Sequence, residues 1–72
     1  MRTTINKTAI RKKVREKGMR ISKDAIDVII DNFSEYEDVE KVIELSIEVA
    51  KLAGRNTVKP EDIELVSKYI KH

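Results

Sequence analysis

The sequence predicts an all-α protein in which a short helix, a long central helix and a second short helix follow one another. Apolar residues recur every three or four positions along most of the chain, which is the helical period. The two glycines, Gly18 and Gly54, and the single proline, Pro60, fall only between such segments. The chain has 72 residues, so residues 1–72 are expected to form a single domain.

The two short helices have recognisable ends. The first is expected over residues 7–17, because Ile10 and Val14 lie at helical spacing and Gly18 follows as a helix-ending residue. The other is expected to begin at Pro60, since proline suits the first helical position and two acidic residues follow it, where they complement the helix dipole.

The central helix is expected to be unbroken. Ser22 is a natural N-cap, and neither proline nor glycine occurs between it and Gly54. This predicts one helix of about 31 residues, about 46 Å long. Its apolar residues recur in alternating steps of three and four, like the seam of a coiled coil, and Glu40 occupies one position of this seam. The apolar seam residues are Ile26, Ile29, Phe33, Tyr36, Ile43, Ile47 and Ala50.

The length of this helix predicts a dimer. A compact domain of this size has a radius of gyration of about 11 Å, and such a domain is shorter than the helix. Two short flanking helices cannot cover both the seam and a second apolar stripe beside it. The residues of this stripe are Val39, Val42, Leu45, Val49, Leu52 and Ala53. An intertwined homodimer without a stable folded monomer is therefore expected, with a dimer core formed by Ile29, Phe33, Tyr36, Ile43 and Ile47.

Composition argues against several classes of function. The chain has no cysteine, and its one histidine is the last residue, His72, so disulfides and Cys/His metal sites are excluded. The adjacent acids Glu61 and Asp62 stand at a helix start, where acids complement the dipole far more often than they catalyse. No enzymatic activity, cofactor, metal or small-molecule substrate is expected. No apolar run reaches membrane-span length and no secretory signal is visible, so a soluble cytoplasmic protein is expected.

Charge is strongly segregated along the chain. Residues 1–23 contain nine Lys/Arg and one Glu, whereas residues 24–54 contain two Lys and nine acids. Such a basic tract indicates nucleic acid or an anionic membrane surface, although a solvated helix face is the plainer alternative. No aromatic residue lies among the basic ones, which disfavours base stacking on single strands. Double-stranded DNA, held through phosphates and through arginines in the minor groove, is the expected partner.

The candidate DNA ligands lie in the first helix and in the two links. The full set is Lys7, Arg11, Lys12, Arg15, Arg20, Lys23, Arg55, Thr57 and Lys59. Arg, Lys and Thr are ordinary phosphate ligands, and the links adjoin helix N-termini that favour anions. Arg55 is also placed to pair with Asp62 and brace the second link. Both roles are compatible because a guanidinium has five donors.

Three segments form a pattern over most of the chain: a link ending in "RIS", a long helix closing on "AKLAGR", and the segment "TVKPEDIEL". This pattern resembles that of archaeal histones. The family's arginine-x-threonine, with an aspartate five residues after the threonine, corresponds to Arg55, Thr57 and Asp62. The resemblance implies a histone fold, a handshake homodimer and chromosome association. It also implies that residues 19–21 lie beside residues 56–58 of the partner, that Arg20 and Thr57 contact phosphate, and that Arg55 and Asp62 form the brace.

The chain also differs from the usual archaeal histone. Its central helix is about two residues longer than the family pattern and its first link about one shorter. Leu52 stands where many members have a histidine used between dimers, and either Arg11 or Lys12 matches the minor-groove arginine. A divergent member whose dimers meet face to face, as a tetramer, fits at least as well as open-ended stacking. The alternative function is a histone-fold subunit that pairs with another protein in a transcription-related complex, favoured by the acidic central helix and Leu52.

Overall fold

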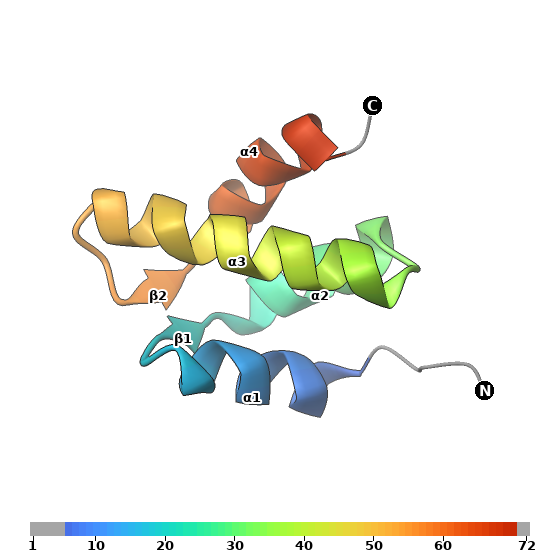
Figure 1. The fold of residues 1–72 in the computed structure, drawn as a ribbon, viewed down its shortest axis with the longest axis horizontal. Helices are drawn as coiled ribbons and strands as arrows, with labels where there is room; N and C mark the ends of the chain where they lie inside the picture. Colours follow the sequence, from blue (N-terminus) through green and yellow to red (C-terminus); the bar gives the residue numbers. More distant parts are fainter. Residues whose placement is uncertain (1–5, 71–72) are drawn as a thin grey trace.

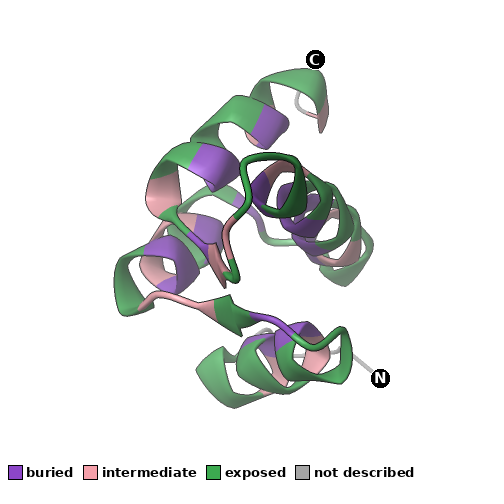
Figure 2. Cartoon of the chain, turned by 90° about the vertical axis from the view of Figure 1, so that its left-hand side faces the viewer, coloured by how far each residue is buried: buried purple, intermediate pink, exposed green. Residues whose placement is uncertain are grey.

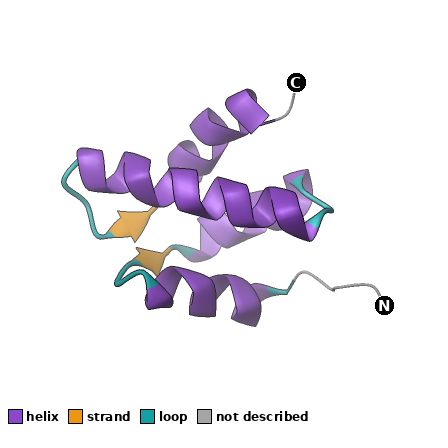
Figure 3. Cartoon of the chain, in the orientation of Figure 1, coloured by secondary structure: helices purple, strands orange, loops and turns teal. Residues whose placement is uncertain are grey.

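The described residues form helices and two very short strands. The computed structural model describes residues 6–70. Helix α3 runs across the molecule, with α2 behind it, α1 on one side and α4 on the other (Figures 1 and 3). The elements are α1 (Lys7–Glu16), β1 (Arg20–Ile21), α2 (Lys23–Asn32), α3 (Tyr36–Leu52), β2 (Thr57–Val58) and α4 (Pro60–Ile70).

Local sequence signals account for most helix starts. The Ser22 side chain accepts a hydrogen bond of 3.1 Å from the amide of Ala25, which confirms Ser22 as the N-cap of α2. Asn6 caps α1 in the same way, accepting 2.8 Å from the amide of Ala9. Helix α4 begins at Pro60 as expected.

Both predicted glycine caps are confirmed. Gly18 and Gly54 have φ of 75° and 73°, a left-handed conformation that glycine adopts without a Cβ penalty. After α3, the amide of Gly54 donates to the carbonyl of Lys51 and that of Arg55 to Ala50, each at 2.9 Å. These two bonds satisfy carbonyls at the helix end. The same pair of bonds closes α1, so each glycine turns the chain into the following strand.

The prediction of an unbroken central helix is wrong. The chain leaves the helix at Phe33 (φ −129°, ψ 133°) and re-enters it after Glu35 (φ −98°, ψ 131°), which separates α2 from α3. Tertiary packing explains the break, because the turn lets both halves of the apolar seam enter one core. Ile29 from α2 and Ile43 from α3 are 0% and 2% exposed. Burial of this kind outweighs the few helical hydrogen bonds lost at a three-residue turn.

The chain therefore covers its apolar seam by itself. Purple buried segments on the helices face one another in Figure 2. The argument that short flanking helices cannot cover a long straight helix does not apply, because the central segment forms two separate helices, α2 and α3. Four of the five residues expected in a dimer core, Ile29, Phe33, Ile43 and Ile47, are buried within the single chain, while Tyr36 is 36% exposed. The homodimer itself stays a prediction.

The two strands form a parallel pair inside one chain. Arg20 is opposite Thr57 and Ile21 opposite Val58. The amide of Arg20 donates to the carbonyl of Asn56 at 2.9 Å. The two links thus meet in the register expected between subunits, but the contact is made within the chain, at the end of the molecule opposite the α2–α3 turn (Figure 1).

Candidate nucleic-acid interface

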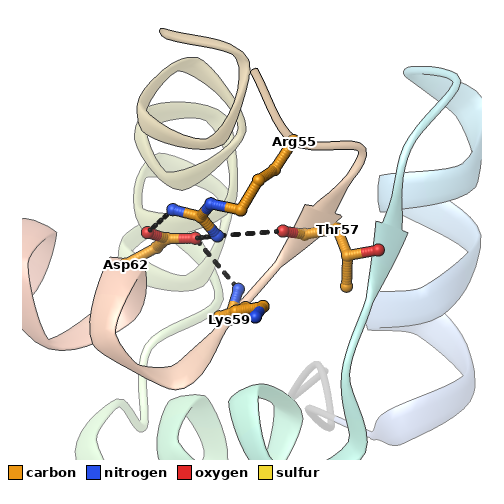
Figure 4. Close-up of polar contacts among 4 residues, drawn as sticks. All are labelled: Arg55, Thr57, Lys59 and Asp62. Carbon is orange, nitrogen blue, oxygen red and sulfur yellow. Dashed lines mark hydrogen bonds and ion pairs between the residues drawn. The ribbon is translucent and has the colours of Figure 1, made fainter. Parts of the chain in front are cut away.

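The link between α3 and α4 is fixed by a two-pronged ion pair. Arg55 Nη1 donates to Asp62 Oδ2 at 2.9 Å, and Nη2 donates to Oδ1 at 2.8 Å. Nη1 also reaches the carbonyl oxygen of Thr57 at 3.3 Å. Figure 4 shows the guanidinium lying against the carboxylate. The geometry is that of a brace, in which the arginine holds both the helix start and the strand.

Asp62 is the centre of this brace. Its side chain is 4% exposed, against 30% for Arg55. It also accepts a hydrogen bond of 3.0 Å from the amide of Lys59, which caps the N-terminus of α4. The hydrogen bond from Arg55, followed by that amide, holds the pKa of Asp62 below its usual value against the opposing effect of burial. The same hydrogen bond raises the pKa of Arg55.

Thr57 contributes its carbonyl oxygen, and not its side chain, to the brace. Its side chain points away from the Arg55–Asp62 pair (Figure 4). Because Thr57 pairs in register with Arg20, residues from both links are aligned at the strand pair. Lys59 is exposed at the start of α4. The structure thus places Arg20 opposite Thr57, with the exposed Lys59 two residues farther along the chain.

A concave basic surface adjoins this strand pair. An open hollow is lined by Arg11 and Arg15 of α1, by Arg20 of β1, and by the apolar or small residues Gly18, Met19 and Ile21. Arg11 and Arg15 are one helical turn apart, so both lie on the same face of α1. All three arginines are exposed and form no ion pair within residues 6–70. Their charge is therefore available to an external anion.

The remaining basic candidates are less concentrated. Lys12 and Lys23 are exposed but do not line the hollow. Lys7 lies 3.6 Å from Asp27 of α2, and both side chains are about half exposed. The structure therefore groups Arg11, Arg15 and Arg20, and leaves the three lysines outside that group.

A contact that sequence reasoning missed joins α1 to α3. Lys13 donates a hydrogen bond to Glu40 of α3, and this bond raises the pKa of Lys13. Glu40 is the residue that interrupts the apolar seam. An acidic residue at an apolar position of a helix indicates that a basic side chain lies nearby. Sequence spacing does not identify that side chain, because Lys13 is 27 residues away. The pair adds a polar contact to a helix whose position is set mainly by the buried Ile10 and Val14, and this helix supplies Arg11 and Arg15.

Large apolar side chains are exposed on the other helices. Leu52, at the end of α3, is 89% exposed, and Tyr69 of α4 is 71% exposed; Leu45 and Leu65 are each 45% exposed. These residues lie on α3 and α4 rather than beside the basic hollow. None of the helices within residues 6–70 is long and apolar enough to cross a membrane.

Comparison with known families supports the resemblance seen in the sequence. Residues 3–66 match the family described as histone-like transcription factor (CBF/NF-Y) and archaeal histone. No curated protein and no solved structure matches the chain. The match spans most of the chain, including both links and the Arg55–Asp62 brace. The chain therefore belongs to the family of histone-like CBF/NF-Y transcription factors and archaeal histones, and its fold is the histone fold.

Proposed function

We propose that this protein is an architectural DNA-binding protein that compacts chromosomal DNA by gripping the phosphates of any double-stranded sequence, without enzymatic activity. Family membership supports a DNA-binding or histone-fold protein in general. The observation that carries the narrower proposal is the hollow of Arg11, Arg15 and Arg20, whose charges have no partner within residues 6–70. Phosphate contacts of this kind position a protein on a duplex without reading its sequence.

The geometry favours Arg11 over Lys12 as the residue that enters the minor groove of DNA. Of the two candidates, Arg11 lines the hollow with Arg15 and Arg20, whereas Lys12 does not. Arginine is also the side chain preferred in narrow minor grooves. Thr57 lies opposite Arg20 in the strand pair and Lys59 is exposed two residues later, which supports phosphate contacts from both, while Arg55 acts mainly by holding the second link.

Salt dependence tests the proposal directly. Each phosphate neutralised by the protein contributes about 0.9 to the slope of log K against log salt. Mobility-shift titrations on two unrelated duplexes at two salt concentrations should give similar affinities that fall steeply with salt. Absence of binding at about 10 µM protein in low salt would exclude the proposal, because non-specific binders reach that affinity.

Single-residue variants locate the binding surface. Arg20→Ala should lower the slope by about 0.9 with little change in melting temperature, and Arg11→Ala should weaken binding more than Lys12→Ala. Lys68→Ala is the matched control, since it removes one exposed positive charge from α4, away from the hollow. Equal losses in Arg20→Ala and Lys68→Ala would mean that binding follows net charge alone and that the hollow is not the site.

The proposal includes self-association as a homodimer or tetramer. Histone-fold families dimerise through this fold in general, and the exposed apolar residues on α3 and α4 offer surface for further contact. The same residues favour a second candidate function, a histone-fold subunit of a transcription-related complex. Leu52, at 89% exposure, carries that alternative. A purified chain that aggregates alone and becomes monodisperse only with a co-expressed partner would favour the subunit.

A further inference from the structure

We propose that the basic hollow of Arg11, Arg15 and Arg20 also accepts the acidic turn of a second copy of this chain, so that head-to-tail association and DNA binding compete for one site. The acidic turn is residues 31–38, from the end of α2 to the first turn of α3. This inference rests on the proposed function, because it takes the hollow as the site for phosphate. It goes further in naming a second occupant that regulates the site.

The first observation is that the acidic turn has free negative charge. It has no lysine or arginine, and its acids are Asp31, Glu35, Glu37 and Asp38. Asp31, Glu35 and Glu37 are exposed, and Asp38 is partly exposed. None of these acids forms an ion pair within residues 6–70. Their carboxylates are therefore available to an external cation.

Helix stability explains only part of this charge. Glu37 and Asp38 stand in the first turn of α3, where acids complement the helix dipole. Asp31 stands in the last turn of α2, where a negative charge opposes the dipole, and that turn has no basic residue to offset it. Glu35, at the N-cap of α3, makes no side-chain capping bond. Asp31 and Glu35 are therefore the acids that the helix ends explain least.

The second observation is that the two charged surfaces lie at opposite ends of the chain. The strand pair beside the hollow lies at one end of the long axis, and the α2–α3 turn lies at the other (Figure 1). The chain extends 38 Å along this axis, whereas charges in water are screened beyond about 10 Å at 0.1 M salt. The acidic turn therefore cannot neutralise the hollow of its own chain. A second copy placed head to tail brings the two surfaces together.

The third observation is that the two surfaces match in shape and chemistry. The hollow is open, has a volume of about 610 Å³ and is lined by α1, β1 and the link between them. The acidic turn is a bend at the opposite tip of the molecule (Figure 1). One carboxylate can accept two parallel hydrogen bonds from one guanidinium. Tyr36, which is 36% exposed within the turn, adds an aromatic ring on which an arginine can stack.

This contact is expected to be weak, reversible and sensitive to salt. Pairs between exposed charges contribute little each and are screened as ionic strength rises. We expect a dissociation constant of roughly 0.1 mM at low salt. Duplex DNA carries one charge per about 1.7 Å of its length, so it should displace the acidic turn. The hollow is thus covered by a neighbouring copy when DNA is scarce and becomes free when DNA is present.

Sedimentation equilibrium at two salt concentrations tests the contact. Wild-type mass should rise with protein concentration at about 20 mM salt, above the mass that it reaches at about 200 mM, where only associations through apolar surface persist. Asp31→Asn combined with Glu35→Gln should weaken the low-salt association about tenfold. Glu48→Gln combined with Glu64→Gln is the matched control, because it removes the same charge from exposed positions outside the turn, and it should leave the association unchanged. Equal losses in both pairs, or no low-salt rise in wild type, would overturn the proposal.

Cross-linking shows which surfaces meet. The chain has no cysteine, so a Ser34→Cys chain can be mixed with a Lys12→Cys chain and treated with a short thiol cross-linker. Lys12 neighbours Arg11 and is exposed, but it does not line the hollow. The mixed product should form at low salt, and it should be lost when Lys68→Cys, on α4, replaces Lys12→Cys. Equal yields with the two partners would refute the head-to-tail contact.

Competition with DNA separates this inference from the proposed function. A duplex too short to hold two copies should abolish the mixed product as it fills the hollow. Product that persists at saturating duplex would refute the shared site. Mobility shifts measure DNA binding independently, and Asp31→Asn combined with Glu35→Gln should retain it. DNA binding without head-to-tail association would overturn this inference alone, whereas absence of DNA binding would overturn both.

Discussion

Among single residues, Asp62 connects the fold to solution pH. Its folded pKa is depressed, chiefly by the hydrogen bond from Arg55. A depressed pKa contributes stability above the unfolded value of about 3.9, and this contribution is lost as pH falls through that value toward the folded pKa. Asp62→Asn should lower the free energy of unfolding at pH 7 by about 1.5–3 kcal/mol.

The pH dependence separates the ion pair from simple packing. Urea unfolding of wild type and Asp62→Asn should differ by a constant amount above about pH 5, and the difference should shrink below about pH 4. Arg55→Ala should remove the same pH-dependent component, because it takes away the main cause of the pKa shift. A difference that stays constant down to pH 2 would show that the charge of Asp62 contributes nothing.

Ser46 is a second residue with a stability consequence. Its side chain is 0% exposed, and its hydroxyl has no hydrogen-bond partner in the described part of the chain. A buried unsatisfied hydroxyl costs free energy, and serine is a poorer helix former than alanine. Ser46→Ala should raise the free energy of unfolding by about 1 kcal/mol. Ser67→Ala is the control, because the Ser67 hydroxyl donates to the carbonyl of Glu64, and its effect should be near zero.

Among the elements, the end of α3 at Gly54 allows a prediction about backbone strain. A Cβ built on Gly54 meets no atom within 4 Å, so substitution there costs only backbone strain at φ 73°. Gly54→Ala should destabilise the protein by about 1–2 kcal/mol. Asparagine tolerates the left-handed conformation better, so Gly54→Asn should cost less. Thermal melts that rank glycine, asparagine and alanine in that order would confirm the strained cap, and equal melts would contradict it.

The elements also show what sequence can predict here. Ser22 and Gly54 act through hydrogen bonds to residues within a few positions, and Pro60 acts through its own fixed φ, so the helix ends they specify follow from local sequence. The break at residues 33–35 was missed because its cause is distant, namely burial of α2 and α3 in one core. The Arg55–Asp62 brace was predicted from spacing and a resemblance, whereas the Lys13–Glu40 contact depends on how α1 docks.

The grouping of arginines was likewise beyond the sequence. Lys12 lies beside Arg11 in the chain, yet only Arg11 lines the hollow with Arg15 and Arg20. Helical spacing placed Arg11 and Arg15 on one face, but the position of Arg20 relative to that face depends on the turn at Gly18. The nine DNA ligands therefore stay a prediction, and the grouping of three of them in one hollow depends on the tertiary arrangement.

At the scale of the whole molecule, the basic hollow and the proposed self-association combine. Each chain carries the hollow of Arg11, Arg15 and Arg20 beside the pair of β1 and β2. A homodimer would therefore carry this hollow twice, once on each chain. A protein with one site can coat DNA, whereas a protein with two can join separate duplexes, because the second contact becomes intramolecular and gains effective concentration.

Protein concentration therefore gives a final prediction about DNA. A single chain keeps Arg11, Arg15 and Arg20 in place, so below the dimerisation range it should still bind duplex DNA, but with roughly half the salt slope of the dimer. It should also fail to join a labelled duplex to an immobilised one, a pull-down that should succeed at concentrations where the proposed homodimer forms. Arg20→Ala controls for the hollow, since it should dimerise yet bridge poorly. Equal bridging by monomer and dimer, with mass measured by analytical ultracentrifugation, would show that joining of duplexes does not depend on self-association.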